Sequence, residues 1–162
     1  MREPRKTSAG SIPAVSLSVL LLLAAWTGTA RAVDAYVQLK GKSNAMYISN
    51  LEIQYATSHA AVAEVVTVIP EQLKYEKYPF ADVRSIEFLE IVGEKDLSPV
   101  YTAKISLRRP GMWRQTRLMP IRELRGQNFG APWTFPLDSG RGYEDNAEAL
   151  QEIRFIPPRP GK

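Results

Sequence analysis

The stretch Leu51-Glu52-Ile53-Gln54-Tyr55 alternates apolar and polar side chains at every position. Successive side chains of a β-strand point to opposite faces of a sheet, so this period of two predicts an antiparallel strand with one buried face. We expect Leu51, Ile53 and Tyr55 to face the core and Glu52 and Gln54 to face water. This pentapeptide is the clearest indication of the fold class.

The flanking sequence extends the same interpretation. Residues 65–69 are β-branched throughout and end at Pro70, which cannot donate to a strand ladder. The alanine-rich residues 60–64 leave open a helical start before that strand. Together with further expected strands, this spacing predicts an all-β fold, either a small antiparallel β-sandwich or a partly open barrel, with at most one or two short helical turns. The further strands are expected at residues 73–80, 83–92, 100–109, 112–121 and 153–156.

Two local signals refine the connections. In Arg109-Pro110-Gly111-Met112, proline and glycine occupy the central positions of a type II turn. Because that twist is not favoured in a two-residue hairpin, we expect a slightly longer loop. Asn146 is expected to cap one helical turn over residues 147–150.

One short pattern occurs twice. Residues 83–88 and 150–155 share the order aliphatic, two polar, Ile, charged, Phe, which places Ile and Phe on one face of a strand. Two similar core strands are the simpler interpretation, and a duplicated half-domain is the alternative.

Residues 79–88, with their Ile86-Glu87-Phe88 strand, the glycine-containing residues 124–130 and the closing residues 150–155 together carry a family resemblance. The chain is similar to small uncharacterised exported bacterial β-domains, which place an Ile-x-Phe strand before a hairpin and another at the end. The resemblance covers about half of the chain and implies a compact β-fold and no activity. Where those domains have an acidic-glycine turn, this chain has Arg108-Arg109-Pro110-Gly111.

The N-terminal residues have the composition of an export signal. Arg2, Arg5 and Lys6 precede the apolar residues 12–26, and Ala30-Arg31-Ala32 fits the small-x-small pattern after which signal peptidase cleaves. An apolar run of about 15 residues is short for a permanent membrane span, which needs about 20. The sequence therefore predicts a signal peptide at 1–32, a single β domain at 33–157, a flexible tail at 158–162, and a periplasmic or secreted protein.

Composition limits the chemistry of the mature domain. Of the 21 basic and 17 acidic residues, four basic and one acidic lie in the first 32 positions, which leaves 17 basic and 16 acidic. A nearly neutral domain offers little long-range attraction to nucleic acid, so no nucleic-acid partner is expected. With no cysteine and a single histidine, His59, neither a thiolate site nor a multi-histidine metal site is possible, and we expect no cofactor and no metal. A hydrolase would have to gather His59 with carboxylates such as Asp82, Glu87 or Glu90, and it is the least favoured alternative.

The least ordinary feature is the charge between Lys104 and Arg125, where seven basic residues, six of them arginine, accompany one acid, Glu123. Arginine binds phosphate and carboxylate with two parallel hydrogen bonds. The alternative is a charged outer face that keeps a sheet edge soluble. We predict a non-catalytic binding or accessory module whose partner is an anionic envelope polymer, a lipid headgroup or an acidic protein. Its predicted contact residues are Arg108, Arg109, Trp113, Arg114 and Arg117.

A second aromatic set supports a different function. Trp133, Phe135 and Tyr143 stand beside the polar residues 138–142 and form a candidate platform for stacking on sugars. Large aromatic side chains also dominate protein cores, so a core role is the alternative. A carbohydrate-binding module is therefore the second prediction, and the sequence leaves the oligomeric state open.

Overall fold

The structure is a computed structural model that describes residues 31–141 and 143–160, with the side chains of 141 and 143–145 left undescribed. Apart from Arg31 and Ala32, the predicted signal peptide lies outside the described residues, as do the last two residues of the predicted tail. Within this part of the chain, no helix is both long enough and apolar enough to cross a membrane.

The described residues form ten strands, one α-helix and three single 3-10 turns. The strands are β1 Val33–Leu39, β2 Met46–Tyr55, β3 Glu64–Ile69, β4 Lys74–Pro79, β5 Val83–Lys95, β6 Ser98–Leu107, β7 Trp113–Leu118, β8 Ile121–Asn128, β9 Ala131–Pro136 and β10 Leu150–Phe155. The helical elements are η1 Pro70–Gln72, η2 Phe80–Asp82, η3 Ser139–Arg141 and α2 Tyr143–Ala149. The prediction of an all-β fold with little helix is confirmed.

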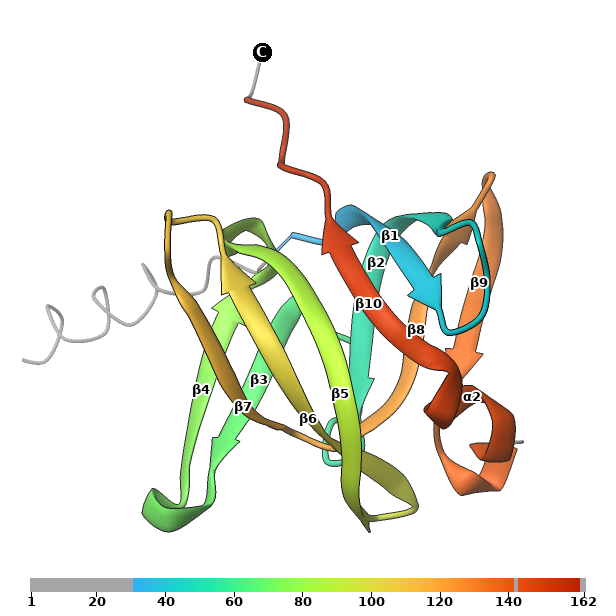
Figure 1. The fold of residues 1–162 in the computed structure, drawn as a ribbon. Helices are drawn as coiled ribbons and strands as arrows, with labels where there is room; N and C mark the ends of the chain where they lie inside the picture. The colour runs from blue at the N-terminus through green and yellow to red at the C-terminus, as the bar shows by residue number, and fades with distance from the viewer. Residues whose placement is uncertain (1–30, 142, 161–162) are drawn as a thin grey trace, which may run out of the picture.

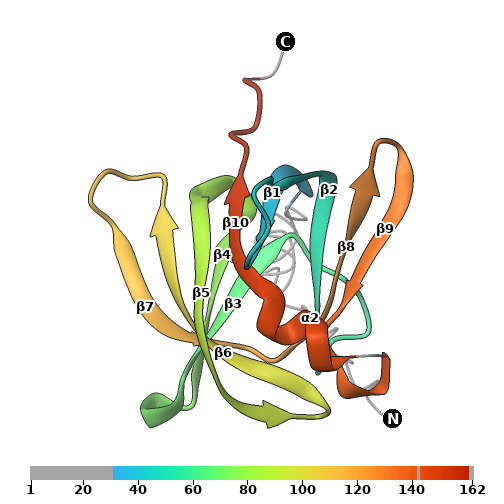
Figure 2. The same ribbon diagram turned by 45° about the vertical axis from the view of Figure 1, so that its right-hand side comes forward.

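All ten strands belong to one antiparallel sheet with the order β4-β3-β7-β6-β5-β10-β1-β2-β8-β9. The sheet curls into a half-barrel, with β3 and β4 behind β5, β6 and β7 in the view of Figure 1. Figure 2 shows the same curl from the side of β8 and β9. Of the two predicted architectures, the partly open barrel is the one found.

Two links connect the β3 side of the curled sheet to its β2 and β8 side. Ile53 of β2 and Val62 form an isolated antiparallel bridge, with backbone N–H···O distances of 2.8 and 2.9 Å. After β7 the chain crosses through Met119 and Pro120, where the Met119 N–H donates to Val66 and the Pro120 carbonyl accepts from Ala56. The prediction of one continuous strand over residues 112–121 is therefore wrong. The segment divides into β7 and β8, which pair with different parts of the sheet.

The core fills the concave side of the sheet. Every second residue of the central strands points inward, as the period of two requires. The largest fully buried side chains are Tyr55, Tyr101, Phe80, Ile48, Leu51, Ile53, Ile86, Ile105, Leu118, Ile121, Leu124 and Leu137.

Strand β2 bends at Asn50, a residue with a left-handed φ of 51°. The Asp34 carboxylate holds the bend, because it accepts hydrogen bonds from the Asn50 N–H at 3.1 Å and the Tyr47 hydroxyl at 2.6 Å. The hydrogen bond to Asp34 raises the pKa of the Tyr47 phenol. Bent in this way, β2 pairs with β1 on one side and with β8 on the other.

The structure corrects three local expectations. Gln54 was expected to face water but is only 6% exposed, because its amide packs under the turn after β2 and donates to the Ser58 carbonyl. Residues 60–64 form no helix, since the bridge at Val62 requires extended backbone. Asn146 lies inside α2 instead of capping it, and its amide donates to the Pro136 carbonyl.

The repeated sequence pattern corresponds to two neighbouring strands. Residues 83–88 lie in β5 and residues 150–155 form β10, and the two strands pair with Ile86 opposite Ile153. Because neighbouring antiparallel strands share a face, both isoleucines enter the same core, as the simpler interpretation predicts.

Candidate binding surface

The predicted contact residues surround the β6–β7 hairpin. Its loop spans residues 108–111 and is closed by the Leu107 N–H, which donates to the Met112 carbonyl at 2.9 Å. Inside the loop the Met112 N–H donates to the Arg109 carbonyl, and Gly111 has a φ of 72°. That positive φ is the one that the third position of a type II turn requires. The turn after Arg109 and the longer loop are both as expected.

Strand alternation divides the arginine cluster between two faces. Trp113 and Arg117 point to the outer, convex face, together with their register partners Ser106 and Thr102 on β6. Arg114 points to the concave side, opposite Ile105. Trp113, Arg114 and Arg117 nevertheless line one groove between β7 and the strands β3 and β4, whereas Arg108 and Arg109 lie outside its lining.

The Arg108 side chain is engaged in hydrogen bonds within the domain. Its Nε donates to the Ala81 carbonyl at 2.7 Å and its Nη2 donates to the Phe155 carbonyl at 3.1 Å. Desolvation in this partly buried position lowers the pKa of Arg108. With two donors directed at backbone carbonyls, this guanidinium connects the hairpin to η2 and to the end of β10.

Arg114 joins β7 to the edge strand β4 across this groove, which has a volume of about 690 Å³. Its Nη1 donates to Glu76 Oε2 at 2.8 Å, and the same oxygen accepts from the Tyr78 hydroxyl at 2.7 Å. The Tyr78 hydrogen bond lowers the pKa of Glu76, while burial together with Glu76 raises the pKa of Tyr78. An anion entering this groove would have to compete with Glu76 for Arg114.

The outer side of the hairpin carries the accessible groups. Trp113 is 58% exposed, and the Lys104 ammonium lies over its ring at 5.2 Å from the centroid. Arg109 at the loop and Arg117 on β7 are exposed, and within the described residues neither side chain has a hydrogen bond or an ion pair. We call Lys104, Arg109, Trp113 and Arg117 the hairpin surface.

The register places further residues beside Trp113 that sequence reasoning missed. Arg154 of β10 lies opposite Ser85 of β5, which lies opposite Ser106 of β6, the partner of Trp113. On its other side Arg154 lies opposite Tyr36 of β1. No local pattern could have indicated this neighbourhood, because it depends on the order of five strands.

The alternative aromatic platform is turned toward the core. The Trp133 and Phe135 rings stack at 5.9 Å with an interplanar angle of 12°. Phe135 is 9% exposed, and Trp133 packs against the buried cluster opposite Gly126. The Tyr143 side chain lies outside the described residues. Neither described ring presents an open face comparable to that of Trp113.

The candidate hydrolytic groups lie apart in the fold. His59 is exposed in the turn after β2, whereas Asp82, Glu87 and Glu90 are exposed along η2 and β5. Among the described residues, no three side chains of His, Asp or Glu are placed to hold a metal ion.

Comparison with known proteins adds no further constraint to this geometry. No family model, curated protein or solved structure matches this chain.

Proposed function

We propose that the protein is an exported, non-catalytic binding or accessory module of the cell envelope that contacts an anionic partner through the hairpin surface. The recognised chemistry is a phosphate or carboxylate group, and binding needs no cofactor. Of the predicted contact residues, we assign to binding only those whose side chains are exposed on the outer side of the hairpin and can reach a ligand.

The observation that carries the proposal is the pairing of an exposed tryptophan with available cations. Trp113 is 58% exposed, although large aromatic side chains stabilise a fold mainly through the area that they bury. Arg109 lies in the loop four residues before Trp113, and Arg117 lies four residues after it on the same face of β7, about 13 Å along the strand. Neither has an ion-pair partner in the described part of the chain. An aromatic ring beside free guanidinium groups suits a ligand that has both an apolar face and an anionic group.

The other arginines explain why only part of the cluster is assigned to binding. Arg122 donates to the Ala56 carbonyl and lies 3.9 Å from Asp138, and Arg125 pairs with the buried Glu123. These side chains, with Arg108 and Arg114, already have partners. Displacing a partnered arginine would leave a buried or partly buried group without its hydrogen bond.

The test measures the affinity of the full chain for dextran sulfate over a series of salt concentrations. Affinity is expected to fall steeply with salt, because contacts between exposed charges are screened. The double variant Arg109→Gln/Arg117→Gln is expected to bind about tenfold more weakly. A loss of this size corresponds to one or two charge-assisted hydrogen bonds.

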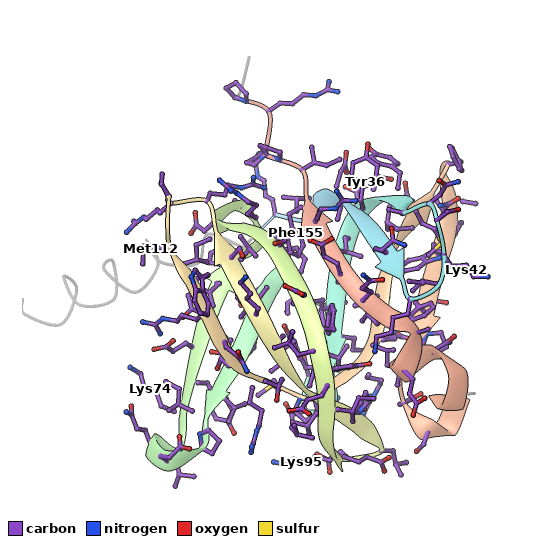
Figure 3. The ribbon with its side chains drawn as sticks, in the orientation of Figure 1. Tyr36, Lys42, Lys74, Lys95, Met112 and Phe155 are labelled. Atoms are coloured by element: carbon purple, nitrogen blue, oxygen red, sulfur yellow. The ribbon has the colours of Figure 1, made fainter. Side chains whose placement is uncertain are left out.

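A matched control removes the same charge elsewhere. Lys42→Gln with Lys95→Gln takes two exposed cations from parts of the molecule that lie away from the hairpin, as the labels for Lys42, Lys95 and Met112 in Figure 3 show. This pair is expected to leave the affinity within about twofold, since only distant screened charges change. Equal losses in the two double variants, or binding that is insensitive to salt, would show that the hairpin surface is not the contact site.

A further inference from the structure

Six residues from six neighbouring strands form a continuous line across the outer face of the sheet. Direct register partners connect each residue to the next, and we call this line the outer row. In order across the sheet it consists of Tyr47, Tyr36, Arg154, Ser85, Ser106 and Trp113.

The outer row has aromatic rings at its two ends and small polar groups between them. Tyr36 is 43% exposed and packs edge-on against Tyr47, with ring centroids 5.7 Å apart. Neighbouring strands lie about 4.8 Å apart, so Tyr36 and Trp113 are separated by about 19 Å along the surface. Ser85 and Ser106 have short side chains. The part of the surface that they occupy, next to Trp113, therefore protrudes little.

A hollow of about 640 Å³ adjoins the tyrosine end of the row. Its lining includes Tyr36, Tyr47 and three residues that follow β10, namely Pro157, Pro158 and Arg159. Arg31 and Ala32 also line it, and the predicted cleavage after Ala32 would remove both from the wall. The row therefore continues from an exposed ring into a concavity whose lining includes Arg159 and also Asp34, a carboxylate that accepts hydrogen bonds from Tyr47 and Asn50.

We propose that the outer row binds a linear anionic polysaccharide that crosses the strands from Trp113 to the hollow beside Tyr36. This inference rests on the proposed function and names its ligand. The aromatic rings stack on sugar faces, and the serine hydroxyls exchange hydrogen bonds with sugar hydroxyls. Arg154 pairs with Glu152 through Nε alone, so its two terminal nitrogens can still bind a carboxylate with two parallel hydrogen bonds.

The surrounding charges favour a polymer whose charges are sparse. The next row on the same face contains Glu152 and Glu87 beside Lys104, and Glu152 lies 3.4 Å from Arg154. Each strand of a DNA double helix carries one phosphate about every 3.4 Å along the helix axis and would meet these acids. A polysaccharide with one carboxylate on each sugar can place its charge at Arg154 and its hydroxyls beside the acids.

The experiment measures binding of the full chain to polygalacturonate and alginate, with neutral dextran and methyl-esterified polygalacturonate for comparison. The acidic polymers are expected to bind, and methyl esterification is expected to weaken binding about tenfold because it removes the charge that Arg154 recognises. Among galacturonate oligomers, affinity should rise with length until the oligomer spans the row and then level off. If no acidic polysaccharide binds more tightly than dextran, or if single-stranded DNA binds more tightly than all of them, the assignment is wrong.

Variants separate this inference from the proposed function. Tyr36→Ala and Arg154→Gln lie outside the hairpin surface, and each is expected to weaken polygalacturonate binding roughly three- to tenfold. Tyr75→Ala and Lys77→Gln are the controls, because Tyr75 is 54% exposed on β4 and both residues lie outside the row. If Tyr36→Ala and Arg154→Gln bind normally while the Arg109/Arg117 double variant does not, the polysaccharide path is wrong and the anionic hairpin surface remains. If neither set changes binding, both proposals fail.

Discussion

The guanidinium of Arg108 donates a hydrogen bond to the backbone carbonyl of Phe155, 47 residues further along the chain. Through Nε the same side chain donates to the Ala81 carbonyl. One arginine therefore connects the loop after β6, the turn before β5 and the end of β10. These carbonyls lie at strand and turn ends, where the sheet ladder does not supply every donor.

Replacing Arg108 is expected to lower the stability of the fold. Arg108→Lys should reduce the free energy of unfolding by about 2 kcal/mol, because a single ammonium cannot direct two donors at two separated carbonyls. Urea unfolding followed by circular dichroism measures the change. Arg109→Lys, at the exposed neighbouring position, should change stability by less than about 0.5 kcal/mol. Equal effects at the two positions would mean that the contacts of Arg108 do not hold the hairpin in place.

Gly126 marks a place where the backbone of β8 approaches a neighbouring side chain. A Cβ atom built there would lie 2.4 Å from Ile48 Cγ2 and 2.9 Å from the Ser49 carbonyl oxygen. Gly126→Ala is therefore expected to cost about 2 kcal/mol through overpacking. Gly93→Ala is the control, because a Cβ at that position meets nothing within 4 Å. Thermal melting of both variants measures the difference, and a Gly126→Ala protein as stable as the control would contradict the packing.

Much of the fold could be predicted from local sequence, because burial on one face of a strand leaves a period of two. Leu51, Ile53 and Tyr55 are buried as predicted, with exposed fractions of 0%, 1% and 2%. The type II turn at Pro110 and Gly111 is likewise encoded by two adjacent residues that restrict the backbone locally.

The rest depends on contacts between distant segments, which local patterns do not contain. Gln54 stands at a polar position in the alternation of its strand, which predicts exposure. Its side chain is nevertheless buried, because the turn after β2 packs over it. Arg108 and Arg114 look alike in sequence, yet one binds backbone carbonyls and the other pairs with Glu76 of β4. The outer row required the order of six strands, and a change of register by one residue would have moved every member to the other face.

The predicted export signal gives a defined N-terminus. Cleavage after Ala32 would leave Val33 first, and Val33 is the first residue of β1, 8% exposed and paired with Leu51. The exported protein is expected to have the intact mass of residues 33–162, measured by mass spectrometry. Ala32→Arg should block cleavage, because signal peptidase requires a small residue there. An exported form that still begins at Met1 would contradict the prediction.

Tyr55 provides a test of stability against pH. Its hydroxyl donates to the Glu64 carbonyl and accepts from the Val66 N–H, both at 2.8 Å, and the side chain is 2% exposed. Burial raises the pKa of this phenol well above its ordinary value of 10.0. A raised pKa means that the folded state favours the neutral phenol. The stabilisation is therefore complete below about pH 10 and is lost as the pH rises above that value.

The Tyr55→Phe variant separates the hydroxyl from the ring. At neutral pH the variant should lose about 2 kcal/mol, because the Val66 N–H and the Glu64 carbonyl lose their partner in the interior. Above about pH 10 its stability should fall less steeply than that of the unmodified protein, because one buried ionising group is gone. Urea unfolding at several pH values measures both effects, with Tyr75→Phe as the matched exposed control. Parallel curves for Tyr55→Phe and the unmodified protein would show that the phenol of Tyr55 does not contribute to the alkaline loss of stability.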